Sequence, residues 1–153
     1  MEELEIRPIL IKDHCKLIEF WNQIEGLGVG GSDDLRRFEI YLKRNPETNF
    51  AALRNGQIIA TALGAHDGRR GMLRHVAVAP EFRGKGIGKK LIQLCLDRLA
   101  KEGIEKNYII VFADNDEGIV FWKKMGWESS DRFKLLWHGE VSSATACDSI
   151  CPS

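Results

Sequence analysis

The strongest constraint on the fold is a unit in which a strand, a glycine-rich turn, a helix and a second strand follow one another. Residues 72–79 are predicted to form a strand that Pro80 ends. Residues 86–102 then carry apolar side chains at helical spacing, before Gly103. Residues 108–113 are continuously apolar, which is typical of a strand buried on both faces. Strands joined through a helix favour a parallel pair, because such a pair needs a long crossover.

Further strands and helices are predicted on both sides of this unit. Before it we expect a strand at 4–10, a helix from Asp13 to about Glu25, a glycine loop at 26–31, a helix that Ser32 caps and that runs to Arg44, and a hairpin of strands 50–53 and 57–65. After it we expect a short helix at 118–125 and a last strand or strand pair at 127–138. This order implies a mixed sheet with helices on both faces.

The charge balance and length limit the class of protein. Lys plus Arg, 22, equals Asp plus Glu, 22, so no overall field favours nucleic acid or a membrane as a partner. No apolar run is long enough to cross a bilayer, and the start of the chain is acidic, which favours a cytoplasmic protein. The 153 residues fit one domain, predicted at 1–138, followed by a disordered tail at 139–153. Cys147 and Cys151 lack the spacing of metal ligands, so no metal site is predicted.

The turn of the central unit is rich in glycine and in cations, and reads Arg83-Gly84-Lys85-Gly86-Ile87-Gly88-Lys89-Lys90. The first N–H groups of a helix lack partners, and the helix dipole is positive there, so this turn is predicted to bind phosphate. The structural alternative is a surface turn. The spacing fits neither a P-loop nor a dinucleotide-binding fingerprint. It fits R-x-x-G-x-G, with Arg83, Gly86 and Gly88 at the fixed positions.

Two motifs resemble one family. The stretch that ends in the glycine turn resembles the acyl-CoA loop of the GNAT superfamily of N-acetyltransferases; it is Val76-Ala77-Val78-Ala79-Pro80-Glu81-Phe82-Arg83-Gly84-Lys85-Gly86-Ile87-Gly88. Residues 115–127, with Asn115, Phe121-Trp122 and Gly126-Trp127, resemble the next motif of that family. The hairpin at 67–71 is similar to YpeA-like members. The resemblance covers about residues 4 to 138 and implies an α/β (α+β), single-domain GNAT fold, with a mixed central sheet of about six to seven strands and about four helices.

The resemblance implies acetyl-CoA as the donor and CoA as a product. In this family the strand before the loop offers backbone groups to the pantetheine arm, here at Val76 and Val78. Arg83 would brace the loop or meet a phosphate, and Asn115 and Phe121 would lie at the cofactor. The N–H groups of Gly84, Lys85, Gly86, Ile87 and Gly88 would hold the pyrophosphate, with Lys85 and Lys89 screening the remaining charge.

The implied reaction is direct attack of a neutral primary amine, on a small molecule or a protein, in a ternary complex. The tyrosine that often protonates the leaving thiolate is replaced by Trp122. Either the thiolate leaves unaided, since thiols have a pKa near 8.5, or another group serves. Trp122 would pack against the cofactor or against the core. The missing tyrosine also keeps an alternative open, a catalytically silent sensor that binds acyl-CoA.

The base and the acceptor contacts are left open by the sequence. Many relatives carry Glu or His at positions matching Met72 or Arg74, and neither residue here is a base. His75 is a catalytic candidate, although simple alternation places it on the opposite face of the strand from Arg74; the alternative is a core or surface histidine. Arg74 would bind a substrate carboxylate or form a cross-strand ion pair.

Acidic residues border the loop that walls the acceptor site in this family. Asp33, a catalytic candidate, and Asp34, a substrate-binding candidate, could attract an ammonium group and pass its proton to water, as could Glu25. The structural alternative for the aspartates is helix capping. The predicted partner is the amine acceptor, with no nucleic acid or membrane, for a monomer or a homodimer.

Overall fold

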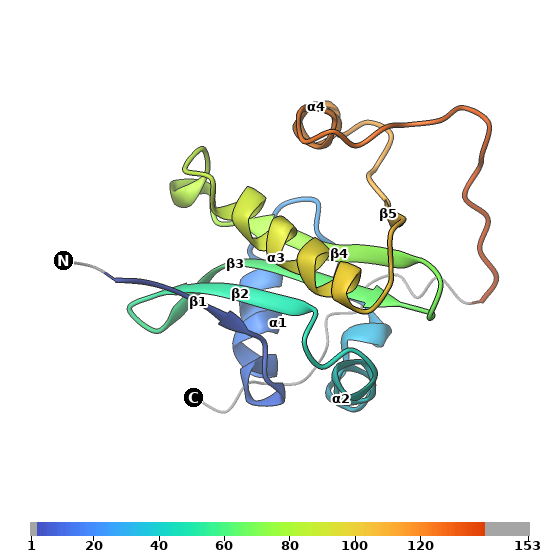
Figure 1. Cartoon of the computed structure of the whole chain (residues 1–153). Coiled ribbons are helices and arrows are strands. Elements are labelled where there is room, and N and C mark those ends of the chain that lie inside the picture. The colour runs from blue at the N-terminus through green and yellow to red at the C-terminus, as the bar shows by residue number, and fades with distance from the viewer. Residues whose placement is uncertain (1–2, 140–153) are drawn as a thin grey trace. The chain divides into compact units, whose positions relative to one another are not determined.

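The computed structural model describes residues 3–139, and a five-stranded sheet organises the larger part of them (Figure 1). The order in the sheet is β1-β2-β3-β4-β5, and the strands are β1 (Leu4–Pro8), β2 (Asn49–Arg54), β3 (Gln57–His66), β4 (Gly71–Val78) and β5 (Asn107–Ile109). The first four strands pair antiparallel with their neighbours. The connection from β4 to β5 crosses over through helix α3, so the sheet is mixed, as predicted.

Helices cover both faces of this sheet. On one face lie α1 (His14–Asn22) and α2 (Leu35–Arg44), and on the other lies α3 (Ile87–Lys101) (Figure 1). Three short 3-10 turns, η1 (Ile11–Asp13), η2 (Gly31–Asp33) and η3 (Pro80–Phe82), join these elements. Among residues 3–139, no helix has both the length and the apolar character needed to cross a membrane.

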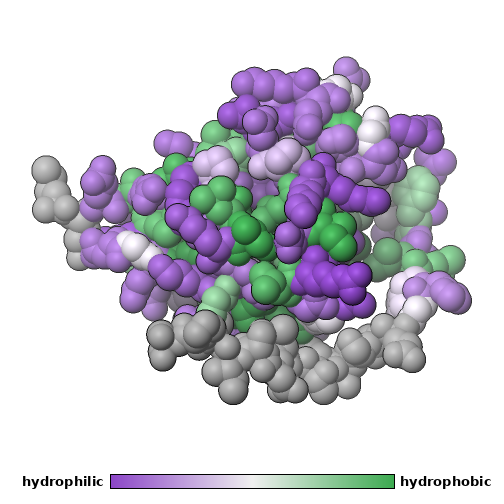
Figure 2. All heavy atoms as spheres, turned by 90° about the horizontal axis from the view of Figure 1, so that it is seen from below, coloured by the Kyte–Doolittle hydropathy of each residue, from purple (hydrophilic) through white to green (hydrophobic). Residues whose placement is uncertain are grey.

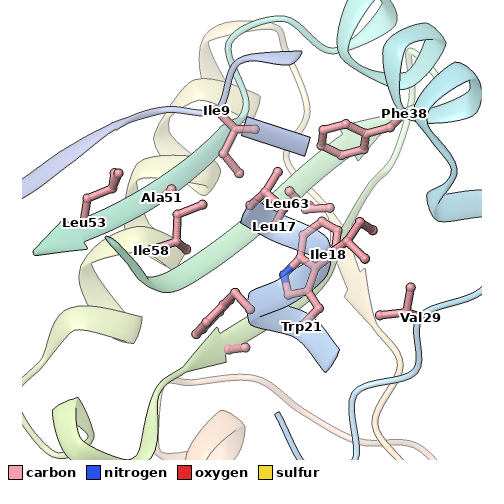
Figure 3. Packing of buried hydrophobic residues seen from close by; sticks show 12 residues of the cluster. Ile9, Leu17, Ile18, Trp21, Val29, Phe38, Ala51, Leu53, Ile58 and Leu63 are labelled. Carbon is pink, nitrogen blue, oxygen red and sulfur yellow. The ribbon is translucent and has the colours of Figure 1, made fainter. Parts of the chain in front are cut away.

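Two hydrophobic layers hold the sheet between its helices. Between the sheet and α1, the side chains of Leu17, Ile18 and Trp21 pack with residues of β2 and β3 such as Leu53 and Leu63 (Figure 3). On the other face, α3 buries Leu91, Ile92, Cys95 and Leu99 completely. Burial raises the pKa of the Cys95 thiol to about 12, so this cysteine is an inert part of the core.

The described residues from Ile109 to Gly139 belong to a second compact unit. It contains α4 (Asp116–Lys124), whose first turn is capped by Asn115 Oδ1, which accepts the N–H of Gly118 at 3.0 Å. Trp122 is buried there, with its ring 4.8 Å from the ring of Trp127 and 5.5 Å from that of Phe121. Trp122 therefore packs as a core residue of this unit.

A bulge in β4 changes the alternation of its side chains. Thr61 of β3 pairs with Ala77, but Leu63 pairs with Arg74, so β4 holds one residue more than β3 over this stretch. Two residues of β4, His75 and Val76, thus lie opposite a single residue of β3. His75 adopts a φ of 48°, a left-handed conformation that few non-glycine residues take and that costs of order 1 kcal/mol.

The bulge makes the predicted orientation of His75 wrong. Directly opposite residues share a face, so Arg74 lies on the face of Leu63, which belongs to the core under α1. The ring of His75 packs edge-on against Trp21 of α1, with ring centroids 4.4 Å apart. Arg74 and His75 therefore serve the same face, because the extra residue shifts the alternation by one position.

Two further predictions are corrected. The sheet has five strands instead of six to seven: β5 ends at Ile109, and residues 127–138 form no strand. Most of the apolar side chains of residues 127–138, among them Phe133 and Trp137, are exposed. No strand among the described residues pairs with this segment, so its apolar pattern does not lead to a strand. The cap of α2 is Asp34 instead of Ser32, because residues 31–33 form η2 first. The predicted tail at 139–153 lies outside the described residues, apart from Gly139.

Candidate functional site

The glycine turn presents unpaired backbone donors at the start of α3. Gly84 and Gly86 have φ values of 76° and 82°, which side chains other than glycine rarely adopt. Gly86 caps α3, and the N–H of Lys90 is the first in the helix to reach back, to the Gly86 carbonyl at 3.0 Å. The N–H groups of residues 87–89 therefore have no partner within the helix. Such donors at the positive end of a helix dipole form a seat for an anion.

Arg83 fastens this turn to the end of β4. Its Nε donates to the carbonyl oxygen of Val78 at 2.9 Å. The N–H of Ala79 donates to Ile59 of β3, and successive backbone groups of a strand point to opposite edges. The N–H and carbonyl of Val78 thus point away from β3. Of the two predicted roles of Arg83, this contact fits bracing, and it leaves the Val78 N–H at the same edge of β4.

One short polar contact at the bulge joins two predicted catalytic residues. His75 Nε2 lies 2.8 Å from Oδ1 of Asp33, which is 42 residues away in the sequence. Both side chains are mostly buried, with 17% and 11% of their surface exposed, so the pair is sheltered but still open to solvent. The bulge and η2 bring the two residues together, since neither the strand nor the loop alone would aim them at each other.

The charge of Asp33 fixes which nitrogen of His75 carries hydrogen. Burial alone would raise the pKa of Asp33, but the hydrogen bond and charge of His75 and the N–H of Gly30 outweigh it and lower the pKa. An ionised carboxylate only accepts hydrogen bonds, so Nε2 of His75 is the donor. In the neutral imidazole Nδ1 is then the unprotonated nitrogen, and residues 3–139 supply no hydrogen bond to it.

A second layer of contacts holds this pair in place. Trp21 Nε1 donates to Thr61 Oγ1 at 2.9 Å, and that hydroxyl donates to the backbone carbonyl of His75 at 2.7 Å. His14 Nε2 donates to the backbone carbonyl of Asp33 at 2.7 Å. Sequence reasoning missed these residues because they come from separate segments, and a Trp or Thr at core spacing carries no functional signal by itself.

The other two acceptor-site candidates, Arg74 and Asp34, differ in whether their charged groups form ion pairs. Arg74 is exposed beside His75, and no carboxylate of residues 3–139 forms an ion pair with it. The nearby phenol of Tyr41 has a raised pKa because it is buried, an effect that the charge of Arg74 partly opposes. Asp34, in contrast, accepts the N–H of Arg37 at 2.8 Å and pairs with its guanidinium at 2.7 Å. Its carboxylate is therefore engaged in capping α2.

The remaining predicted residues divide between the two units. Lys85 and Lys89 are exposed on the glycine turn, and Val76 is half-buried in the bulge. Asn115 and Phe121 belong to the second unit, where Asn115 caps α4 and Phe121 contacts Trp122. The larger unit thus joins the anion seat to the His75–Asp33 pair through a single strand, β4.

Relatives that are named as acetyltransferases resemble this chain in sequence. A model of the acetyltransferase (GNAT) family matches residues 16–127. An acetyltransferase of Yersinia pestis is 33% identical over 127 residues, which are 83% of this chain and 83% of the relative. An acetyltransferase of Pectobacterium atrosepticum is 32% identical over the same shares of both chains.

Two solved structures have similar folds at low identity. A predicted acetyltransferase from Clostridium acetobutylicum, solved with acetyl-CoA, has a TM-score of 0.71 at 22% identity, over 88% of this chain and 96% of that one. The PaiA N-acetyltransferase from Thermoplasma acidophilum, in complex with coenzyme A, has a TM-score of 0.72 at 20% identity, over 84% and 92%. The family match spans well over half of the sequence and includes β4, the glycine turn and α3. This chain belongs to the GNAT family of acetyltransferases.

Proposed function

We propose that this protein transfers an acetyl group from acetyl-CoA to a primary amine, on a small molecule or a protein, with both substrates bound together. The observation that carries the proposal is the position of His75, paired with Asp33 of η2, on β4, the strand that leads directly toward the glycine turn. A proton acceptor and an anion seat joined by one strand are the two parts that such a transfer needs. Residues 1–138 are the proposed working domain.

The glycine turn fits the diphosphate of this cofactor. Positive φ values at Gly84 and Gly86 and the free N–H groups at 87–89 form a concave set of donors without bulky side chains. Lys85 and Lys89 supply charge, and the Val76 and Val78 backbone is assigned to the pantetheine arm. Asn115 and Phe121 are assigned to the cofactor from the family motif. Acetyl-CoA supplies the acetyl group as an activated thioester.

His75 has the role of proton acceptor. A primary amine is mostly an ammonium ion at neutral pH and attacks only after losing a proton. Nδ1 of His75 takes this proton, and the Asp33 carboxylate on Nε2 offsets the positive charge of the imidazolium. The amine nitrogen forms the amide bond and loses its second proton to water while the C–S bond breaks, and the imidazolium later returns the first proton to water. The thiolate leaves without an acid, because thiols are moderately acidic.

Arg74 has the role of orienting the acceptor. It is the exposed cation next to His75, and its planar guanidinium suits a bidentate contact to a carboxylate. An amine that also bears a carboxylate would thus be held with its nitrogen near Nδ1. Asp34 was a further candidate for this site, but its capping contacts favour a structural role.

A calorimetric titration with acetyl-CoA, followed by a thiol-release assay over a panel of amines, tests the function. We expect saturable binding in the micromolar range and thiol release that depends on the amine. Absence of binding at a concentration of about 1 mM, the upper end of the usual range of KM values for enzymes, would refute the proposal. Binding without amine-dependent release on the panel would refute the transferase assignment alone.

A further inference from the structure

A hollow beside the glycine turn has no role in the chemistry above. It has a volume of about 370 Å³ and lies between the β2–β3 hairpin turn and η3. Its polar lining consists of Arg54, Asn55, Gln57, Glu81 and Lys85, next to the ring of Phe82. A smaller hollow of about 230 Å³ shares Arg54, Phe82 and Lys85 and extends to Ile87, the first residue of α3. The two together form a surface that continues from the anion seat.

Two cations in this hollow are held by the same aromatic ring. Cζ of Arg54 lies 5.2 Å from the ring centroid of Phe82, and Nζ of Lys85 lies 5.6 Å from it. Arg54 comes from the end of β2, whereas Lys85 belongs to the glycine turn itself. They outnumber Glu81, the one carboxylate of the lining. Both cations line the same two hollows, so an anion that entered either hollow would lie near both positive charges.

The cofactor has a second anionic group at the distance of one sugar from its diphosphate. This group is the phosphate monoester on the 3′ oxygen of the ribose, which carries a charge of about −1.5 to −2 at neutral pH. With the diphosphate on the N–H groups of residues 84–89 and the thioester arm along β4, the nucleoside end has to leave the turn by another route. The hollow lies next to the turn and shares Lys85 with it.

We propose that Arg54 and Lys85 bind the 3′-phosphate of CoA in this hollow, with Phe82 holding both cations in position. The guanidinium of Arg54 has the fork geometry that matches phosphate oxygens, and Lys85 adds a second charge-assisted hydrogen bond. This subsite discriminates CoA from ligands that lack the 3′-phosphate. The inference rests on the proposed function, since it requires that acetyl-CoA binds at the glycine turn.

The test compares the calorimetric affinities of CoA and 3′-dephospho-CoA for the wild type, Arg54→Gln and Lys85→Gln. We expect the wild type to prefer CoA roughly tenfold, as one or two partly exposed charge-assisted hydrogen bonds would give. Arg54→Gln and Lys85→Gln should each reduce the preference to about threefold or less. The affinity for 3′-dephospho-CoA should change less than about twofold in Arg54→Gln, whereas Lys85→Gln should weaken it as well, because Lys85 also supplies charge near the diphosphate. Lys101→Gln is the matched control, because it removes the same charge at the far end of α3, about 20 Å away.

The possible results separate this inference from the proposed function. If the wild type binds both ligands equally, or if the variants keep the preference, the 3′-phosphate subsite is wrong while the transferase proposal stands. Equal loss of affinity for both ligands would also overturn it, since the cations would then act on the turn as a whole. If the wild type binds neither ligand, both proposals fail. Circular dichroism establishes whether each variant is folded. If Arg54→Gln does not fold, the preference of Lys85→Gln for CoA over 3′-dephospho-CoA decides the test.

Discussion

At the scale of single residues, the proposed catalysis depends on the contact between His75 and Asp33. His75 keeps a left-handed backbone conformation, and Thr61 and Trp21 hold it there through a chain of two hydrogen bonds. The strain of a non-glycine residue at positive φ needs such support from its surroundings. The same strain aims the imidazole at Asp33, so the unusual backbone and the candidate chemistry have one structural cause.

Asp33→Asn tests the orienting role of the carboxylate. We expect kcat to fall about 10- to 100-fold, because an amide no longer fixes the tautomer of His75 or offsets its positive charge. The decisive readout is a double-mutant cycle with His75→Gln: the double variant should be about as slow as His75→Gln alone. Asp97→Asn on the exposed face of α3 serves as control. Independent, multiplicative losses would show that the two residues do not act as a unit.

Arg74→Ala tests the acceptor contact. The variant should raise the KM for amines that carry a carboxylate by about tenfold or more, because a bidentate charge-assisted pair is lost. Neutral amines and acetyl-CoA should be affected less than about twofold. Steady-state kinetics with matched acidic and amidated acceptors measures the difference. Equal losses for both acceptors would contradict a carboxylate contact and favour a purely structural role of Arg74.

At the scale of elements, two glycines flank α3 and allow a matched comparison. Gly86 precedes the helix with a φ of 82°, and Gly103 follows it with a φ of 86°; an added Cβ would meet no other atom within 4 Å at either position. Alanine at either site should cost about 1 kcal/mol of stability through backbone strain. Only Gly86→Ala should also weaken acetyl-CoA binding, by about five- to tenfold, as measured by calorimetry. Equal binding by the two variants would argue against the anion seat.

The bulge in β4 is the element that the sequence could not reveal. The pattern of residues 72–79 identified a strand, and the glycine turn and α3 were found within one or two residues of their observed bounds. Nothing in the apolar alternation marks an extra residue at His75, because the bulge is set by pairing with β3. The predicted face of His75 is therefore wrong, although the chemistry of the two side chains makes both His75 and Asp33 catalytic candidates.

At the scale of the whole molecule, sequence reasoning succeeded for the layers and failed at the C-terminal side of the sheet. In a long helix such as α3, the spacing of the apolar residues indicates which side of the helix is buried. The helices on both faces of the sheet could therefore be predicted from the sequence. The strand expected at 108–113 is shorter than predicted, and Ile110 and Phe112 are exposed. An apolar run indicates a strand only where a neighbouring strand pairs with it, and sequence alone does not supply that neighbour.

Stability should depend on pH through two aspartates. Arg7 forms two hydrogen bonds with Asp13, at 2.7 and 2.8 Å, and these with the N–H of Leu10 outweigh burial and lower the pKa of Asp13. The pKa of Asp33 is lowered as well. A carboxyl group with a folded pKa below its unfolded value stabilises the fold above that unfolded value, and the contribution is lost as pH falls through the folded pKa.

The unfolding free energy should therefore drop progressively as the pH falls below about 5. Asp13→Asn should lower it by about 2 kcal/mol at pH 7, and the difference from wild type should narrow as the pH falls through the lowered folded pKa, where the wild-type carboxyl group becomes protonated. Urea unfolding, followed by tryptophan fluorescence at several pH values, measures the unfolding free energy of the wild type and of the variant. A difference that stays constant as the pH falls would show that the charge of Asp13 contributes nothing to stability.

The most direct test of the central claim is the rate of thiol release by His75→Gln at saturating acetyl-CoA and amine. The account predicts a kcat reduced about 10²- to 10⁴-fold near neutral pH, as for loss of a general base. The loss should shrink at alkaline pH, where the amine deprotonates in solution, and the affinity for acetyl-CoA should change less than about twofold. A variant with wild-type kcat at neutral pH, or one that loses acetyl-CoA binding in proportion to its rate, would contradict the account.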